Sequence, residues 1–242
     1  MALRTRLPTR GPLVTVIMST YNRAGVIRRA LESVVAQTYQ DWELCVVGHA
    51  TPDRTAEVVA SVGDPRIRFH NLDHRVPDTG SATKNYALEH MATGEWVSYL
   101  DDDDAFLPHN LATFVAAAQA HPDEVFFYAR SRYRDARTGR PILGNPFRRW
   151  LHGYSREKLQ RYNFLDINCV MHRRSLVDEV GMFKPEFYFN DYELWLRISE
   201  RHDFHYINAV LTDRFVSEPP FLARAWRKGL HLLRHGRSTP YK

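Results

Sequence analysis

Four consecutive aspartates, Asp101 to Asp104, are the residues of this sequence best suited to chemistry. They directly follow the apolar run 96–100 and lie shortly before Pro108. Neighbouring carboxylates repel one another unless a positive charge lies among them, and a divalent cation that also holds a phosphorylated substrate would remove the repulsion. The alternative is a solvated acidic turn that caps the helix expected near Pro108, because aspartate is favourable at a helix start. A single aspartate would suffice as a cap, so four in a row favour a metal site.

The elements around this cluster follow from the pattern of apolar residues. Continuous apolar runs predict buried strands, and apolar residues at helical spacing predict amphipathic helices between them. The predicted strands are 13–18, 42–47, 66–70 and 96–100, and the predicted helices are 24–37, 53–62, 81–91 and 110–120. Strands that alternate with helices predict an α/β fold with a mostly parallel central sheet flanked by helices.

The same pattern predicts where the aspartates lie. In a sheet of this kind, ligands bind beyond the carboxyl ends of the strands. Three polar segments directly follow predicted strands, namely 19–22, 48–51 and 101–104. We therefore expect these segments to meet at one edge of the sheet.

The second half of the chain is less regular. Its patterns predict further strands, a hairpin turn and two helices. The strands are 124–134, 166–172 and the last ones within 205–216, the turn is 137–140, and the helices are one that ends near Gly181 and one over 190–201.

The composition excludes several classes of protein. With 242 residues, of which 44% are hydrophobic and 25% charged, the chain has enough material for the core of a soluble globular domain. No apolar run approaches the roughly 20 residues that a membrane helix needs, and residues 1–12 lack the apolar core of a signal peptide. Cys45 and Cys169 lie in apolar surroundings and are expected to be buried free thiols, which fits a reducing compartment. We therefore expect a cytoplasmic protein.

The positive charge lies at the two ends of the chain. The net charge is +5, yet residues 219–242 hold six Lys or Arg and no acid, residues 1–10 hold three arginines, and the region between is mildly acidic. Because a nucleic-acid-binding domain usually carries its basic patch on the fold itself, no nucleic-acid partner is expected. Residues 221–234 combine a basic and an apolar side of a helix. This predicts peripheral contact with the inner face of the membrane through 219–237, or a helix docked on the acidic body.

Five stretches in register resemble the large family 2 of inverting, nucleotide-sugar-dependent glycosyltransferases, which have the GT-A fold. The matching stretches are Val14–Arg23 (VTVIMSTYNR), Gln37–Val47 (QTYQDWELCVV), Gly94–Pro108 (GEWVSYLDDDDAFLP), Val180–Lys184 (VGMFK) and Asn190–Arg197 (NDYELWLR). The resemblance implies transfer of a sugar from a nucleotide-diphosphate sugar, with a UDP-sugar favoured and a GDP- or dTDP-sugar as alternatives. The implied acceptor is a hydroxyl of a glycan, a lipid-linked glycan or another cell-envelope precursor.

The resemblance also implies a division of the chain. Residues 1–10 are expected to be a basic N-terminal extension, 11–218 a single Rossmann-like GT-A domain, and 219–242 a basic amphipathic tail. Within the domain, residues 11–108 are expected to bind the donor and 109–218 the acceptor. Acceptor specificity is expected to lie in the least regular parts of that second half.

By resemblance, the Asp-x-Asp signature of the family falls on Asp101 and Asp103. Asp103 is expected to coordinate Mn²⁺ or Mg²⁺ on the donor diphosphate, and Asp101 to contact the ribose or the metal. Asp102 lies between them in the donor site. Because four identical residues leave the register ambiguous by one, Asp104 is the reserve ligand. A metal at this place would also stabilise the leaving diphosphate.

The resemblance implies a nucleotide site next to the aspartates. Thr20 and Tyr21 are expected to flank the base, Tyr21 by stacking, while Asn22 fixes the loop. The alternative for Tyr21 is a turn residue that covers the sheet edge. Lys84 is expected either to face the diphosphate or to be an ordinary surface lysine.

One position departs from the family pattern. His49 stands where the family usually has an aspartate that accepts a hydrogen bond from uracil, and Ala50 replaces the glycine that usually follows. Because histidine both accepts and donates hydrogen bonds, a uridine donor is compatible with this residue but not required by it.

An inverting transferase needs a base that deprotonates the acceptor hydroxyl. The family base lies in an acidic pair at the start of a helix, and this pair is Asn190-Asp191 here. Asp191 is therefore the predicted catalytic base, with an ordinary helix-start acid as the alternative. Trp195, on the same helix, is predicted to be a core residue.

Two other functions are compatible with the sequence. A non-catalytic sugar-nucleotide or glycan-binding module on the same fold would explain why His49 and Asn190 depart from the family pattern. A nucleotidyltransferase is less favoured, because residues 19–23 are not the Gly-rich basic loop that such enzymes place after the first strand.

Overall fold

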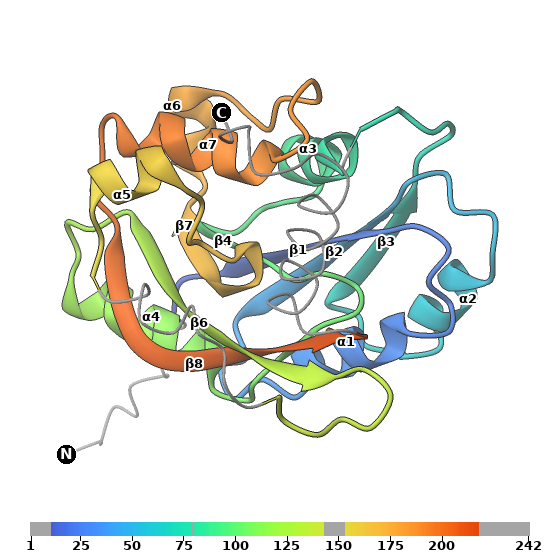
Figure 1. Ribbon diagram of the computed structural model, residues 1–242. Coiled ribbons are helices and arrows are strands. Elements are labelled where there is room, and N and C mark those ends of the chain that lie inside the picture. Colours follow the sequence, from blue (N-terminus) through green and yellow to red (C-terminus); the bar gives the residue numbers. More distant parts are fainter. Residues whose placement is uncertain (1–10, 79, 143–152, 218–242) are drawn as a thin grey trace, which may run out of the picture.

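The apolar runs of the first half form one side of a continuous sheet. The computed structural model describes residues 11–78, 80–142 and 153–217 (Figure 1). Four parallel strands are joined by helices on the pattern predicted from the sequence. They are β1 (Val14–Thr20), β2 (Trp42–Gly48), β3 (Ile67–Asn71) and β4 (Trp96–Tyr99), and the helices between them are α1 (Ile27–Val35), α2 (Thr55–Ala60) and α3 (Ser81–His90).

The second half extends the same sheet. Over the described residues the sheet has eight strands in the order β3-β2-β1-β4-β7-β6-β8-β5, and β7 and β5 run antiparallel to their neighbours. The long strands β6 and β8 curve along one side of the molecule (Figure 1). The elements after β4 are β5 (Ala105–Phe106), α4 (Asn110–Ala120), β6 (Phe126–Asp135), α5 (Arg156–Arg161), a 3₁₀ helix η2 (Ile167–Cys169), β7 (Val170–Arg173), α6 (Ser175–Val180), α7 (Asn190–Ser199) and β8 (His205–Val216).

Three features of the second half differ from the sequence prediction. The strand predicted over 166–172 begins as η2, because the Asp166 side chain accepts a hydrogen bond from the backbone N–H of Asn168 and holds the turn. Strand β5 and helix α5 were not predicted, since both are too short to show a period. The hairpin turn predicted at 137–140 is present after β6, where the backbone N–H of Asp135 donates to the carbonyl of Arg140.

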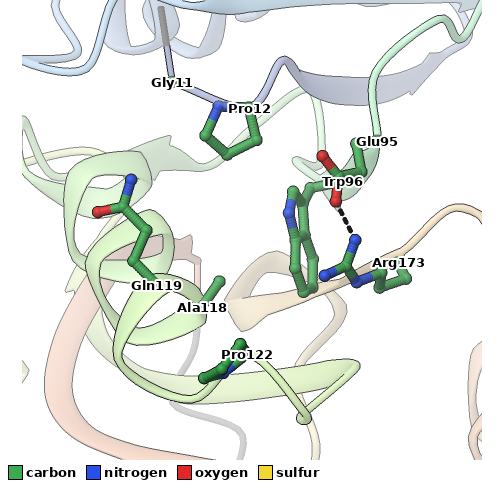
Figure 2. A pocket seen from close by; sticks show the side chains of 8 residues that line it. All are labelled: Gly11, Pro12, Glu95, Trp96, Ala118, Gln119, Pro122 and Arg173. Carbon is green, nitrogen blue, oxygen red and sulfur yellow. Dashed lines mark hydrogen bonds and ion pairs between the residues drawn. The ribbon is translucent and has the colours of Figure 1, made fainter. Parts of the chain in front are cut away.

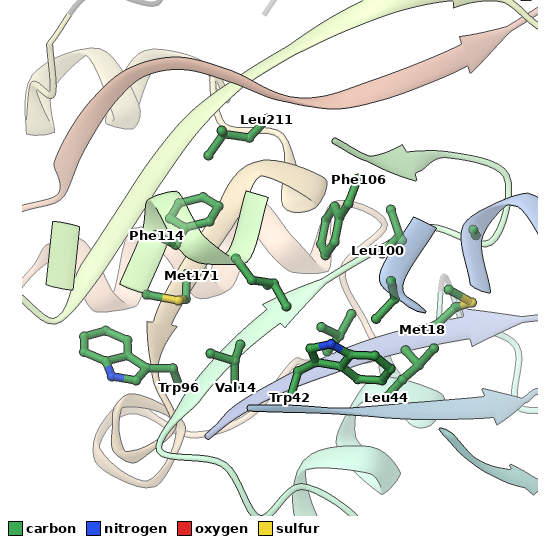
Figure 3. Close-up of a cluster of buried hydrophobic side chains, with 14 of the residues drawn as sticks. Val14, Met18, Trp42, Leu44, Trp96, Leu100, Phe106, Phe114, Met171 and Leu211 are labelled. Carbon is green, nitrogen blue, oxygen red and sulfur yellow. The ribbon is translucent and has the colours of Figure 1, made fainter. Parts of the chain in front are cut away.

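Two apolar layers hold the helices on the sheet. Helices α1 and α4 pack on one face in a layer that includes both strand and helix side chains (Figure 3). Its largest members include Met18, Trp42, Leu44, Trp96, Leu100, Phe106, Phe114, Met171 and Leu211. Helices α3, α6 and α7 cover the opposite face, where Trp195 is fully buried among aromatic rings, as predicted.

A buried histidine in this second layer makes folding sensitive to acid. His172 donates from Nδ1 to the carbonyl of Arg173 and accepts at Nε2 from the hydroxyl of Tyr99, each at 2.8 Å. Burial lowers the pKa of His172 to about 4, below its ordinary value of 6.5. The neutral ring therefore belongs to the folded state, and protonation favours the unfolded chain.

We expect His172 alone to add about 3 kcal/mol to the free energy of unfolding as pH rises from about 4 to about 6.5. The contribution is complete above the unfolded pKa and is lost as pH falls through the folded one. His172→Gln keeps a donor and an acceptor but does not titrate. Urea unfolding of both proteins at several pH values should show the difference in stability shrinking towards low pH. Parallel stability curves would contradict this role of His172.

Both cysteines are buried and free, as expected. Among the described residues, no helix has the length and apolar character required to cross a bilayer. The proposed N-terminal extension 1–10 and the proposed tail 219–242 lie outside the described residues.

Candidate active site

The three strand-end segments meet as the topology predicted. Strand β1 lies between β2 and β4, with Thr20 opposite Gly48 and Ile17 opposite Tyr99. The backbone N–H of His49 donates to the carbonyl of Thr20 at 2.9 Å, which joins the first two segments. The aspartates follow β4 at the same edge of the sheet.

The four aspartates alternate between the interior and the solvent. Asp102 and Asp104 are only 7% and 2% exposed, whereas Asp101 is exposed and the side chain of Asp103 is 39% exposed. The two residues of the cluster with the more accessible surface are thus Asp101 and Asp103, on which the resemblance places the Asp-x-Asp signature.

The protein itself supplies part of the positive charge that the cluster needs. Arg23 lies 3.4 Å from a carboxylate oxygen of Asp102 and 3.5 Å from one of Asp103. Arg214, from β8, lies 3.3 Å from Asp104, which also accepts the backbone N–H of Phe215 at 2.8 Å. Asp104 is therefore buried and already bonded to Arg214 and to the backbone of Phe215, which argues against its role as the reserve metal ligand.

Asn168 organises the inner side of the cluster. Its side-chain carbonyl accepts the backbone N–H of Asp101 at 2.6 Å, and its amide donates to the carboxylates of Asp101 at 2.9 Å and Asp104 at 3.0 Å. The neighbouring Asp166 accepts from the hydroxyl of Ser131 and lies 3.4 Å from Arg214. The short helix η2 thereby fixes the backbone from which the aspartates project.

Burial outweighs the effect of the nearby arginines on the pKa of Asp102 and Asp104. The carboxylates near Arg214 raise its pKa, with Asp166 the largest cause and Asp104 and Asp101 adding to it. Burial nevertheless raises the pKa of Asp104 to about 7 and that of Asp102 to about 6. A cation bound at the cluster would favour the ionised form of these carboxylates.

Lys84 connects the aspartates with the predicted base. Its side chain is buried in α3, and burial lowers its pKa while Asp101, Asp191 and Asp78 raise it. The surface-lysine alternative is thus wrong. Asp191, at the start of α7, is partly exposed, and burial raises its pKa, an effect that Lys84 opposes. The ammonium of Lys84 is close enough to both Asp101 and Asp191 to affect their ionisation.

The predicted nucleobase site is covered by the segment between β3 and α3. The guanidinium carbon of Arg75 lies 4.0 Å from the ring centre of Tyr21, whose side chain is 37% exposed. His49 is buried and accepts the backbone N–H of Val76 at Nε2, at 2.9 Å. Since that bond occupies the acceptor of a neutral imidazole, the remaining Nδ1–H is a donor.

The loop after β1 is held from the neighbouring loop. Asn22 and Ala50 both have positive φ angles, of 57° and 52°, which are uncommon outside glycine. The backbone N–H of Asn22 donates to the hydroxyl of Thr51 at 2.8 Å, and Thr51 is bound in turn by the side chain of Asn71. Asn22 thus contributes to the loop through its backbone conformation, where the sequence suggested its side chain.

The donor set fits a metal that arrives with a phosphorylated ligand. Among the described residues, no group of three or more His, Cys, Asp or Glu is placed to hold an ion. Asp101 and Asp103 supply carboxylate oxygens, and Mg²⁺-type sites commonly use one or two carboxylates together with substrate phosphates and water. A complete protein cage is therefore not required.

Several residues of this site could not be found by sequence motifs. Asp166, Asn168 and Arg214 lie more than 60 residues along the chain from Asp101 and reach it only through the pairing of η2 and β8 with the sheet. Their one local signal is the Asp-x-Asn spacing, which is typical of a side chain that caps its own turn. Asn85 of α3 ties the loop before α7 to this helix by bonding both backbone groups of Phe183.

A pocket of about 410 Å³ lies elsewhere, near the beginnings of β1 and β4 (Figure 2). It is lined by Gly11, Pro12, Glu95, Trp96, Ala118, Gln119, Pro122 and Arg173. Its charged residues, Glu95 and Arg173, pair with each other, and none of the predicted site residues lines it. The site at the carboxyl ends of β1, β2 and β4 therefore remains the candidate active site.

The chain is similar in sequence to glycosyltransferases. A glycosyltransferase of Rickettsia typhi is 28% identical over 211 residues, which cover 84% of this chain and 64% of the relative. A Campylobacter jejuni enzyme named GalNAc(5)-diNAcBac-PP-undecaprenol beta-1,3-glucosyltransferase is 26% identical over 80% of this chain and 62% of its own length. The chain thus spans less than two thirds of these relatives.

Solved structures share the fold. Staphylococcus aureus TarS 1–349 in complex with UDP-GlcNAc matches with a TM-score of 0.67 and 17% identity, over 87% of this chain and 60% of that one. The mannosyltransferase PcManGT of Pyrobaculum calidifontis, in complex with GDP-Man and Mn²⁺, matches with a TM-score of 0.69 and 23% identity, over 97% and 67%. The sheet and its flanking helices are therefore those of GT-A glycosyltransferases. The sequence profile of Glycosyl transferase family 2 matches residues 15–181, and the chain belongs to this family.

Proposed function

We propose that this glycosyltransferase moves a sugar from a nucleotide-diphosphate sugar to an acceptor hydroxyl with inversion at the anomeric carbon. The observation that carries the proposal is Lys84, a lysine buried in α3 whose pKa is lowered by burial and raised by both Asp101 and Asp191. Because the cluster of aspartates suits a metal-bound diphosphate and Asp191 suits a base, this proximity supports one site with a donor side and an acceptor side.

On the donor side, Asp103 and Asp101 are the proposed ligands of Mn²⁺ or Mg²⁺. Their exposure, against the burial of Asp102 and Asp104, supports this register. The bound cation would offset the charge of the diphosphate and of the leaving group. Lys84 adds a positive charge beside the phosphates, and Asp102 supports the loop through its ion pair with Arg23.

Thr20, Tyr21, Asn22 and His49 are the proposed contacts of the nucleoside. The resemblance favours a UDP-sugar, but Nε2 of His49 already accepts a backbone hydrogen bond and is not free to accept one from uracil. The similar structures hold UDP-GlcNAc and GDP-Man, so both kinds of donor belong in any assay.

On the acceptor side, Asp191 is the proposed general base. It takes the proton of the acceptor hydroxyl while the oxygen forms a bond to the anomeric carbon. The bond between that carbon and the diphosphate oxygen breaks, and the nucleoside diphosphate leaves from the opposite face. A carboxylate whose pKa is raised by burial accepts a proton more readily than an ordinary aspartate.

The relative that acts on an undecaprenol-linked glycan supports a glycan or lipid-linked acceptor and a role in polysaccharide biosynthesis. A cytoplasmic enzyme, with 11–218 as its catalytic domain and membrane contact through 219–237, is consistent with such an acceptor.

The alternative of a non-catalytic binding module rests on His49 and on Asn190, which replaces the first acid of the family pair. Release of nucleoside diphosphate from UDP-GlcNAc, UDP-glucose and GDP-mannose, measured with Mn²⁺ present, separates the two functions. We expect release from at least one donor, dependent on the metal. Binding of a nucleoside diphosphate without cleavage of any donor would support the module instead.

A further inference from the structure

Three consecutive aromatic side chains project into solvent directly before the proposed base. Phe187, Tyr188 and Phe189 are 45%, 75% and 63% exposed, and Phe189 immediately precedes α7, which carries Asp191. Exposed apolar side chains gathered at one place mark an interaction site more often than scattered ones. We propose that this aromatic segment, 187–189, binds the neutral pyranose ring of the acceptor and positions its hydroxyl at Asp191. The inference rests on the proposed function and specifies its acceptor side.

The segment projects from a fixed base. The backbone N–H and carbonyl of Phe183 bond the side chain of Asn85 at 3.0 and 2.8 Å. Arg197 of α7 donates to the carbonyl of Met182 at 2.6 Å, and Lys184 pairs with Glu193 of the same helix at 3.1 Å. The residues before the aromatic segment are thus tied to α3 and α7, the helices that carry Lys84 and Asp191, and the segment itself leads directly into α7.

The rings have a shape suited to a sugar. Tyr188 and Phe189 are perpendicular, with an interplanar angle of 89° and ring centroids 4.9 Å apart. A pyranose has an apolar face of C–H bonds and a polar rim of hydroxyls. One ring of this corner provides a flat surface for the C–H face, and the second provides a wall. The tyrosine hydroxyl adds a polar atom for the rim.

Charge favours a neutral sugar over a membrane surface as the occupant. Glu186 is exposed beside the segment, Asp191 follows it, and the positive charge of Lys184 is balanced by Glu193. Lys84 opposes the charge of Asp191, and Arg197 also pairs with Glu193, so the charges around the rings are close to balanced and show no basic excess. A segment that inserts among anionic lipids would be expected to carry basic neighbours.

The test uses saturation-transfer NMR with the methyl β-glycosides of glucose, galactose, mannose and N-acetylglucosamine. The protein is saturated with UDP or GDP and Mg²⁺, because Mn²⁺ broadens the signals. We expect transfer to C–H protons of at least one glycoside. Binding should weaken about tenfold when one ring is removed by Tyr188→Ala or Phe189→Ala. Tyr188→Phe should retain most of the binding, and Val26→Ala, which removes an exposed apolar side chain elsewhere, should leave it unchanged.

The inference is overturned if no glycoside binds the unmodified protein, or if the alanine variants bind as well as it does. It is also overturned if the unmodified protein sediments with phosphatidylglycerol vesicles and the Tyr188→Ala/Phe189→Ala variant does not. Calorimetry of UDP and GDP binding with Mg²⁺ on the same proteins shows whether only this inference fails or the proposed function fails as well. Retained nucleotide binding limits the failure to the aromatic segment, whereas its absence from the unmodified protein counts against the proposed function.

Discussion

Replacing Asp191 by asparagine should lower the rate of sugar transfer by about 10²- to 10⁴-fold, the usual contribution of a general base. The change removes the proton acceptor but keeps the size of the side chain and its place at the start of α7. Binding of nucleoside diphosphate with Mn²⁺ should persist, because the proposed metal ligands are untouched. The measurements are turnover of a donor that the unmodified protein uses, and calorimetry of its nucleoside diphosphate.

Asp178→Asn is the matched control. Asp178 is an exposed acid in the first turn of the neighbouring helix α6. Asparagine at either position should cost about 0.3–1 kcal/mol of stability through the helix dipole. If Asp191 is only an acid at a helix start, the two variants will have similar turnover. The catalytic assignment requires that Asp191→Asn alone is inactive.

The dependence of turnover on pH is an independent test of Asp191 as the base. Because burial raises the pKa of Asp191, its carboxylate form is lost at a higher pH than for an ordinary aspartate, whose pKa is about 3.9. Turnover should therefore fall as pH decreases, with the acid limb above that value. A rate that is constant down to the ordinary pKa of aspartate would contradict a base in this environment.

Replacing Asp103 by asparagine should remove most of the gain in nucleotide affinity that Mn²⁺ provides. One carboxylate ligand contributes on the order of several kcal/mol to holding a metal-bound diphosphate, which corresponds to a loss of roughly 100-fold or more. The fold should survive, since the side chain of Asp103 is 39% exposed and its pair with Arg23 spans 3.5 Å. Exposed pairs of this kind contribute about 0–1 kcal/mol.

Asp203→Asn serves as its control, because Asp203 forms a similar exposed pair with Arg156, at 3.2 Å, outside the proposed site. We expect this variant to bind the nucleoside diphosphate and Mn²⁺ like the unmodified protein. If the Asp103 and Asp203 variants bind the nucleoside diphosphate and Mn²⁺ equally well, Asp103 is not a metal ligand.

The strand-end edge of this site was predictable because it depends on local patterns. Buried strands such as β1 and β2 are continuous apolar runs, and parallel pairing then places Tyr21, His49 and Asp101 at one edge. What local patterns leave open is which aspartates face outward. That is decided by Arg214 and Asn168, which bury Asp104 through contacts 110 and 64 residues apart in the sequence.

The acceptor side was less predictable for a related reason. The sequence is compatible with two roles for Lys84, a residue of the site or a surface lysine, because helical spacing does not specify which loops cover a helix. The loop before α7 covers it in the structure, through bonds between Asn85 and Phe183. The exposure of residues 187–189 also depends on how this loop is anchored. From the sequence alone, a run of three aromatic residues is equally compatible with a buried core segment.

The most direct measurement is calorimetry of UDP and GDP binding to the unmodified protein with and without Mn²⁺. If Asp101 and Asp103 hold a metal-bound diphosphate, at least one nucleotide should bind much more tightly with the ion. By linkage, Mn²⁺ should bind more tightly by the same factor when that nucleotide is present. Equal affinity with and without Mn²⁺, or no binding of either nucleotide, would contradict the account.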